Sequence, residues 1–331
     1  MMKSKLAFLI FLIFIFSQIS LAHAFSLFFT QNQSPLIQIY GLPSGGSASL
    51  LPPGKGDLRL TLDYASNYVA DTNNRETLIL DGESARFTMG GKYGLPEGIE
   101  VGLEIPMIFW GGGFLDDFII SYHSTFGFPQ GGRDQAPRHR LLIYYQKDGQ
   151  ELLKKQGASS GIGDIKLSGG WQIYEWKEKA ALSLNTCLKL PTGNSADLHG
   201  SGSVDFSVWI NGRRDFWSTY GKVSLLGAGG VMFLSSGNVL PEQQEHFVWF
   251  GSAGIGWQPW PRLSFKIQIN GHSSFYKESD LRELNAVSAQ IVLGGTIALS
   301  KQAFLDMGIV EDLVVKTSPD VIFHLSGRYI F

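Results

Sequence analysis

The chain ends with the stretch Val321-Ile-Phe-His-Leu-Ser-Gly-Arg-Tyr-Ile-Phe331, in which apolar and polar residues alternate. One set of alternate positions is apolar or aromatic apart from a glycine: Val321, Phe323, Leu325, Tyr329 and Phe331. The other set carries the polar side chains: Asp320, His324, Ser326 and Arg328. Alternation with a period of two predicts a β-strand that has one apolar and one polar side.

A terminal strand that stops on an aromatic residue resembles the closing strand of Gram-negative outer-membrane β-barrels, where it is also the assembly signal. Tyr329 and Phe331 would supply that signal here. The resemblance implies outer-membrane lipid and the barrel-assembly machinery as partners.

Residues 1–24 have the features of a secretory signal peptide. Lys3 and Lys5 precede the apolar run Leu6–Phe16, and Ala22-His23-Ala24 is a small-x-small cleavage site. We therefore predict cleavage near Ala24 and a location in the cell outer membrane.

Composition narrows the class of protein. Loss of the two leader lysines changes the formal charge from −2 to −4, a mild acidity that gives no reason to expect a nucleic-acid partner. Cys187 is the only cysteine, which excludes an intrachain disulfide. No apolar run after the leader is long enough for a transmembrane helix. Strands can cross a bilayer only as a closed barrel, because in lipid every backbone group must pair internally.

Twelve segments between residues 57 and 331 have the pattern of strands. They are Asp57–Val69, Glu76–Tyr93, Ile99–Trp110, Gly163–Tyr174, Ala180–Leu190, Ser203–Ile210, Phe216–Phe233, Phe247–Trp257, Arg262–Phe275, Ala286–Leu299, Ala303–Glu311 and Asp320–Phe331. Short links occur at Gly94–Gly98, Glu175–Lys179, Asn211–Asp215, Gln258–Pro261 and Ser300–Gln302. Mostly longer links separate them: Gly111–Ile162, Pro191–Gly202, Leu234–His246 and Tyr276–Asn285. Short periplasmic turns and long outer loops predict an all-β, transmembrane, antiparallel up-and-down barrel of about 12 strands over residues 57–331.

Tryptophan placement supports a membrane barrel, because all eight tryptophans lie at or near predicted strand ends or turns. Amphipathic rings prefer the membrane–water boundary. The predicted girdle residues are Trp110, Trp171, Trp176, Trp217, Trp249, Trp257 and Trp260, and Trp209 lies with the short-turn group.

Two regions fall outside the strand pattern. Residues 25–56 are rich in Gly, Pro and Ser, and are either a periplasmic arm or a plug segment that enters the lumen. Residues 111–161 are an extracellular insertion with a helix, ended by Gly127, and a hairpin around Lys147-Asp-Gly-Gln150. We predict that this helix-plus-hairpin insertion caps or constricts the pore. Its lid candidates are Phe114, Phe118, Tyr122, His123 and Phe126.

Several short motifs together resemble an uncharacterised family of Gram-negative outer-membrane barrels, similar in pattern to barrels associated with aromatic-degradation (phenol meta-pathway) systems. The motifs are Asn32-Gln-Ser-Pro-Leu36, Tyr40-Gly-Leu-Pro43, Leu115-Asp-Asp-Phe-Ile119 with His123, Phe126-Gly127, Gly161-Ile-Gly-Asp-Ile165 and Leu190-Pro-Thr-Gly-Asn194. The resemblance implies a barrel that passes small solutes, hydrophobic ones among them. It supplies no catalytic residues.

If the apolar faces meet lipid, the polar faces line the lumen. The lumen-lining candidates are Arg59, Asp63, Arg86, Lys92, Glu100, Glu104, Lys166, Lys189, Asp205, Lys222, Lys266, His272, Asp306 and Arg328. A hairpin centred on Pro96 would place Lys92 opposite Glu100 and Arg86 diagonal to Glu104. These charges either neutralise the interior or form a selectivity ring; because both signs are present, the sequence predicts no strong preference for anions or cations.

An outer-membrane lipid hydrolase is the enzymatic alternative, because such barrels use a serine–histidine pair. The candidates are His272 with Ser273 and Ser274, and His199 with Ser201, and neither has a third partner at an interpretable spacing. No cofactor is predicted. Metal ligands are not predicted either, since Asp71-Thr-Asn-Asn-Arg-Glu76 lacks EF-hand spacing and the histidines lack zinc spacing.

The sequence therefore predicts an outer-membrane channel or uptake barrel for small solutes. Two alternatives stay open: the lipid hydrolase, and a non-transporting structural or surface barrel whose loops bind a partner.

Overall fold

The computed structural model describes residues 25–127, 131–177, 179–314 and 316–331. The predicted signal peptide lies outside them. None of the helices in these residues has the length and apolarity to cross a membrane.

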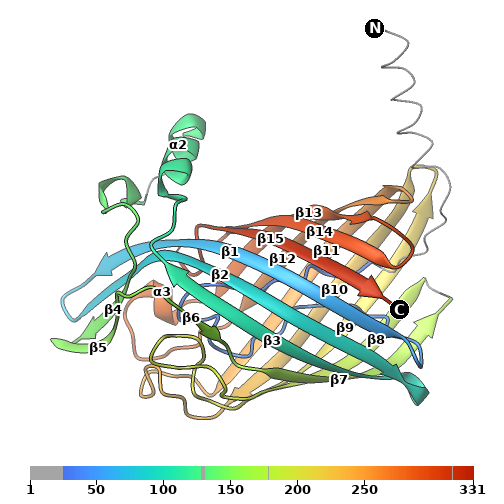
Figure 1. The fold of residues 1–331 in the computed structure, drawn as a ribbon, viewed down its shortest axis with the longest axis horizontal. Coiled ribbons are helices and arrows are strands. Elements are labelled where there is room, and N and C mark those ends of the chain that lie inside the picture. Colours follow the sequence, from blue (N-terminus) through green and yellow to red (C-terminus); the bar gives the residue numbers. More distant parts are fainter. Residues whose placement is uncertain (1–24, 128–130, 178, 315) are drawn as a thin grey trace, which may run out of the picture.

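Twelve long strands form one closed antiparallel barrel, which confirms the predicted fold class and strand number (Figure 1). In chain order the barrel strands are β1 (Gly56–Thr72), β2 (Glu76–Leu95), β3 (Ile99–Gly111), β7 (Lys166–Trp176), β8 (Ala180–Lys189), β9 (Asp205–Ser218), β10 (Gly221–Leu234), β11 (Phe247–Trp260), β12 (Leu263–His272), β13 (Ser288–Ala298), β14 (Ala303–Asp312) and β15 (Val321–Ile330). Each pairs with its neighbour in this order, and β15 pairs with β1.

The closing seam follows the alternation of the terminal strand. β1 and β15 pair from Asp57 opposite Ile330 to Ser66 opposite Val321. On β15, Leu325 is 43% exposed and faces outward, whereas His324 is 3% exposed and faces inward, opposite Asp63. The strand thus has the predicted apolar outer side and polar inner side.

The remaining elements extend from the barrel. They are β4 (Leu142–Lys147), β5 (Gln150–Lys155) and β6 (Ser159–Ile162), the helices α2 (Asp116–Phe126) and α3 (Arg282–Asn285), and the 3-10 turns η1 (Pro96–Gly98) and η2 (Arg133–Gln135). The hairpin β4–β5 continues the sheet beside β2. Its turn residues Asp148 and Gly149 have φ of 50° and 80°, which is the left-handed pair that an Asp-Gly hairpin prefers. The predicted helix and hairpin are therefore present.

One predicted turn is wrong. Residues 211–215 continue β9, and the chain turns at Thr219 and Tyr220. Arg213 and Asp215 look like turn residues in sequence, but both face inward, where the Nη1 of Arg213 lies 2.6 Å from the Oδ2 of Asp215. These two inward side chains continue the alternation of inward polar and outward apolar residues along β9.

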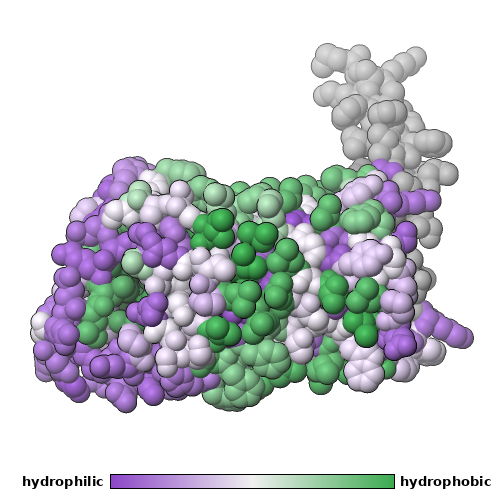
Figure 2. Space-filling view, turned by 60° about the horizontal axis from the view of Figure 1, so that its bottom comes forward, coloured by the Kyte–Doolittle hydropathy of each residue, from purple (hydrophilic) through white to green (hydrophobic). Residues whose placement is uncertain are grey.

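The barrel has two unlike ends. Both Gly56 and Phe331 lie at the end with the short connections, here the short-turn end, whereas the insertion and the longer loops lie at the long-loop end. Apolar residues of every strand face outward, and Figure 2 shows them across the middle of the molecule, with hydrophilic residues densest toward the long-loop end. The barrel therefore has an apolar belt on its outer surface and a polar wall on its inner surface.

Candidate functional site

Residues 25–51, here the interior segment, run inside the barrel (Figure 1). They contain no strand, yet most of their side chains are buried. The segment rises from the short-turn end, turns at residues 34–40, and returns to β1 at the same end. The two arms touch where the N–H of Leu27 donates to the carbonyl of Gly46 at 3.1 Å.

The first arm stacks three aromatic rings against cations of the wall. The ring centres lie 4.8 Å from Lys222 for Phe25, 4.0 Å from Lys266 for Phe28, and 4.4 Å from Arg59 for Phe29. A cation over an aromatic face contributes about 0.5–2 kcal/mol, with the larger values at desolvated sites. These contacts hold the arm without covalent or β-ladder bonds.

Hydrogen bonds also attach the first arm to the wall. The N–H of Phe28 donates to Gln268 at 2.6 Å, and the hydroxyl of Thr30 donates to Asp63 at 2.9 Å. The amide nitrogen of Asn32 lies 3.0 Å from the Nε2 of His272.

The turn of the segment closes the long-loop end with apolar contacts. Tyr40 stacks on Phe275 with ring centres 4.9 Å apart, and the hydroxyl of Tyr276 donates to the carbonyl of Leu36 at 2.8 Å. Leu36 is 1% exposed and Leu198 from the β8–β9 loop is fully buried in the same cluster. Apolar packing thus seals the mouth opposite to the one by which the segment enters.

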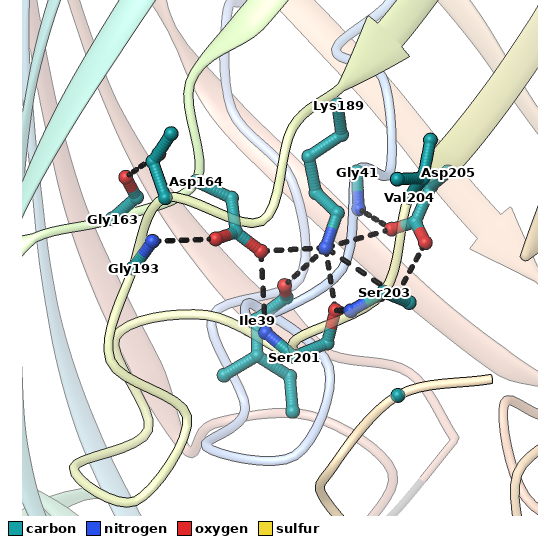
Figure 3. Close-up of polar contacts among 12 residues, drawn as sticks. Ile39, Gly41, Gly163, Asp164, Lys189, Gly193, Ser201, Ser203, Val204 and Asp205 are labelled. Atoms are coloured by element: carbon teal, nitrogen blue, oxygen red, sulfur yellow. Dashed lines mark hydrogen bonds and ion pairs between the residues drawn. The ribbon is translucent and has the colours of Figure 1, made fainter. Parts of the chain in front are cut away.

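Lys189 lies at the centre of a buried polar cluster, here the Lys189 latch, formed with Asp164, Ser201, Ser203 and Asp205 (Figure 3). Its Nζ lies 2.5 Å from Asp164 and 3.2 Å from Asp205, and the lysine is 1% exposed.

The latch also holds the interior segment. The N–H of Gly41 donates to the Oδ2 of Asp205 at 2.8 Å, and Lys189 donates to the carbonyl of Ile39 at 3.4 Å. Gly41 allows this close approach, because a Cβ there would lie 3.0 Å from the Cβ of Lys189.

Two further cations of the wall bind the backbone of the segment. The Nη1 of Arg86 donates to the carbonyl of Gln38 at 2.9 Å. The Nζ of Lys166 donates to the carbonyl of Leu42 at 3.2 Å and to the Oε1 of Gln31 at 3.5 Å.

The structure places every lumen-lining candidate on the inward side of its strand. Register and burial agree for Arg59, Asp63, Arg86, Lys92, Glu100, Glu104, Lys166, Lys189, Asp205, Lys222, Lys266, His272, Asp306 and Arg328.

The predicted register of the β2–β3 hairpin is wrong. Lys92 lies opposite Gly102 and Glu100 opposite Gly94, because the three residues of η1 form the turn and shift the pairing by two residues. Lys92 still reaches Glu100 diagonally, with Nζ and Oε1 2.8 Å apart. Arg86 lies opposite Ile108 and binds the interior segment.

The lid prediction is also wrong. Leu115, directly before α2, and Ile119 within it pack against apolar side chains on the outward side of the β1–β15 seam: Tyr64, Val321 and Phe323. The helix needs an apolar partner, and the outer wall provides it. Phe114 and Phe118 are 66% and 55% exposed. Tyr122, His123 and Phe126 belong to α2, but their side chains are outside the described part of the structure.

A buried ion network anchors the insertion to the outer wall. Arg133 is 3% exposed, and its guanidinium lies 2.7 Å from Asp116 and 2.5 Å from Asp320. It also donates to the hydroxyl of Ser66 on β1 at 3.1 Å. The insertion therefore straddles the seam from outside.

Six of the seven girdle tryptophans are well exposed: Trp171, Trp176, Trp217, Trp249, Trp257 and Trp260. Trp110 is a correction, because it is 4% exposed and its Nε1 donates inside the barrel to the carbonyl of Leu198 at 3.3 Å. Trp209, at 9% exposure, faces inward too. Because both rings face the inside of the barrel, neither can lie at a membrane–water boundary.

Neither candidate serine–histidine pair forms in the described residues. The Nδ1 of His272 lies 2.8 Å from the carbonyl of Ser273, and Asn32 occupies its Nε2. The Nε2 of His199 lies 3.1 Å from the hydroxyl of Ser159, whereas Ser201 belongs to the Lys189 latch. Burial lowers the pKa of His199. The same residues contain no group of three His, Cys, Asp or Glu side chains arranged to hold a metal ion.

Three similar solved structures share 14% or less of their sequence with this chain. The COG4313 outer membrane channel from Pseudomonas putida F1 has 14% identity and a TM-score of 0.54, over 86% of this chain and 97% of that one. The KdgM porin in complex with disordered oligogalacturonate has 7% identity and a TM-score of 0.41, over 84% and 99%. The P. putida toluene transporter TodX has 11% identity and a TM-score of 0.36, over 84% and 89%. The first comparison shows a shared fold, that of an outer-membrane β-barrel.

No curated protein gives a significant match to the chain. A family model, described as a protein of unknown function (DUF3187), matches residues 4–331. This confirms the resemblance to an uncharacterised family of outer-membrane barrels. The chain belongs to the DUF3187 family.

Proposed function

We propose that this protein is an outer-membrane channel for small solutes, in which the interior segment acts as a plug. The outward apolar belt and the inward polar wall suit a barrel in lipid with a watery interior. The short-turn end would face the periplasm and the long-loop end the outside. Exposed Tyr329 and Phe331 suit recognition by the assembly machinery, and cleavage near Ala24 would release the segment's first residue, Phe25.

The observation that carries this proposal is how the plug is attached. Both of its ends lie at the short-turn end, so it can withdraw as a loop without threading past the wall. Its contacts with the wall are separate hydrogen bonds and ring–cation contacts, each of modest strength. The barrel strands pair with one another and need no contribution from the segment.

The charged composition of the inner wall also favours a channel over a structural barrel whose interior stays permanently packed. A barrel whose interior never fills with water is most stable when that interior is apolar, because buried charges lose their hydration. This wall instead carries charged residues on almost every strand. Such a wall favours small polar solutes over the hydrophobic ones that the family resemblance implies.

The test compares conductance in planar bilayers for the full chain and for a variant that lacks residues 26–50. We expect the deletion to give larger and longer-lived conductance steps. A matched control lacks residues 117–126 of α2, which lies outside the wall, and should conduct like the full chain.

Heat-dependent gel mobility establishes first that each variant is a folded barrel, because the β1–β15 seam is untouched in both. A folded deletion variant that gives neither conductance steps nor solute flux in liposomes would contradict the proposed channel.

A further inference from the structure

Arg86 and Lys166 differ from the other cations of the inner wall. Both are 5% exposed, and in the described residues no carboxylate oxygen lies within 4.0 Å of either one. Lys92, Lys189, Arg213, Lys266 and Arg328 each have such a partner.

The carboxylates nearest in register do not form ion pairs with Arg86 or Lys166. Asp63 lies directly opposite Arg86 in the β1–β2 register, but its Oδ1 accepts from Thr30 and lies 2.7 Å from the Nδ1 of His324. Glu104 lies opposite Lys166 in the β3–β7 register without forming an ion pair with it. On its other side Glu104 lies opposite Gly90 of β2, four residues along that strand from Arg86.

Carbonyl oxygens of the interior segment take the place of anions at both cations. Gln38 supplies the oxygen at Arg86, and Leu42 supplies the one at Lys166. A carbonyl satisfies the hydrogen bonds of a buried cation but does not neutralise its charge. When the plug withdraws, both cations lose these acceptors together.

We infer that the open lumen is selective for small anions, chiefly carboxylates and halides, and that Arg86 and Lys166 are the residues that select them. This inference rests on the proposed function. A guanidinium matches a carboxylate with two parallel hydrogen bonds, and an ammonium binds an anion as a point charge. Rings of Arg and Lys give anion pores their selectivity.

The cavity beside the plug lies on the same path. Four cations line it at the short-turn end, together with three carboxylates and serines of the interior segment: Arg59, Lys92, Lys166 and Arg328, with Asp57, Glu100 and Glu104. An anion that leaves Arg86 and Lys166 toward this end therefore meets further cations, as stepwise conduction requires.

The experiment measures reversal potentials in a KCl gradient across planar bilayers. All proteins are full-length and carry Asp205→Ala, which weakens the Lys189 latch and lengthens openings. The test variant adds Arg86→Gln and Lys166→Gln. The control adds Arg75→Gln and Asp148→Asn, which removes an exposed cation and its paired carboxylate, 2.8 Å apart at the long-loop end, and so leaves the net charge unchanged.

We expect chloride to permeate better than potassium in the parent and the control, and the preference to disappear or reverse in the test variant. Conductance steps without chloride preference in the parent, or with the same preference in the test variant, would overturn the inference and leave the channel standing. Absence of steps in all three folded proteins would overturn the proposed channel itself. Acetate in place of chloride should give the same order of permeabilities.

Discussion

Replacement of Asp205 by alanine should release the plug. The N–H of Gly41 donates to the Oδ2 of Asp205 at 2.8 Å, and Asp205 is 1% exposed. A buried hydrogen bond to a charged group contributes about 1.5–3 kcal/mol. Lys189 stays paired in the variant, because Asp164 lies 2.5 Å from its Nζ. The loss is therefore concentrated on docking of the interior segment.

A change of about 1.4 kcal/mol alters an equilibrium constant tenfold. The docked-to-undocked ratio of the segment should fall by about 10–150-fold. Single-channel recording measures this ratio as open probability. Where the wild-type protein opens rarely, the variant should open for a large part of the record.

The matched control is Asp81→Ala. The Asp81 side chain is 4% exposed and pairs with Arg140 at 2.6 Å on the long-loop side, away from the interior segment. It should change stability without changing open probability. If Asp205→Ala and Asp81→Ala leave the open probability alike, the reasoning about the latch fails.

Two other predictions concern the long-loop end. Arg133→Met should detach the insertion from the outer wall, because breaking a buried ion pair costs about 3–5 kcal/mol. Limited proteolysis of this variant should cut within residues 112–141 while the barrel stays intact. The control Arg138→Met, whose side chain is 36% exposed beside Asp117, should not make the insertion sensitive to protease. Burial lowers the pKa of His199, so the neutral form stabilises the β8–β9 loop fully above the unfolded pKa of about 6.5, and this stabilisation is lost as the pH falls through the folded value. After correction for the intrinsic pH dependence of amide exchange, the protection of residues 190–204 should therefore fall between pH 7 and pH 4.5 more in the wild type than in His199→Gln; an equal fall in both proteins would contradict it.

Alternation predicts which way a side chain faces, and it predicts little else about the lumen. His324 and Arg328 are inward because the period of two is fixed by the pleat. Their partners depend on register, which the turn sets, and the three-residue turn after Leu95 moved Lys92 to a position opposite Gly102.

The interior segment and the insertion show where sequence reasoning stops. Phe25, Phe28 and Phe29 follow no strand or helix period, so only their distant partners, such as Lys266 from β12, place them in the lumen. The helix α2 was predictable from its spacing. Its location was not, because an apolar helix face can pack as well on the outside of a barrel as across its mouth.

The most direct test of the account locks the plug to the wall. A Cβ at position 41 would lie 3.4 Å from the Cβ of Asp205, close to the separation of about 3.5–4.5 Å found in disulfides. The Cβ of Lys189, 3.0 Å away, has to move by only a few tenths of an ångström to make room. The variant carries Gly41→Cys and Asp205→Cys, with Cys187→Ala to remove the native thiol. Conductance is recorded from the same protein in oxidising and then in reducing buffer.

The oxidised protein is expected to stay closed, since the disulfide holds residue 41 at the wall. Reduction should open it, because the latch carboxylate is missing. Equal conductance before and after reduction, with the disulfide confirmed by mass, would show that the interior segment does not control the lumen.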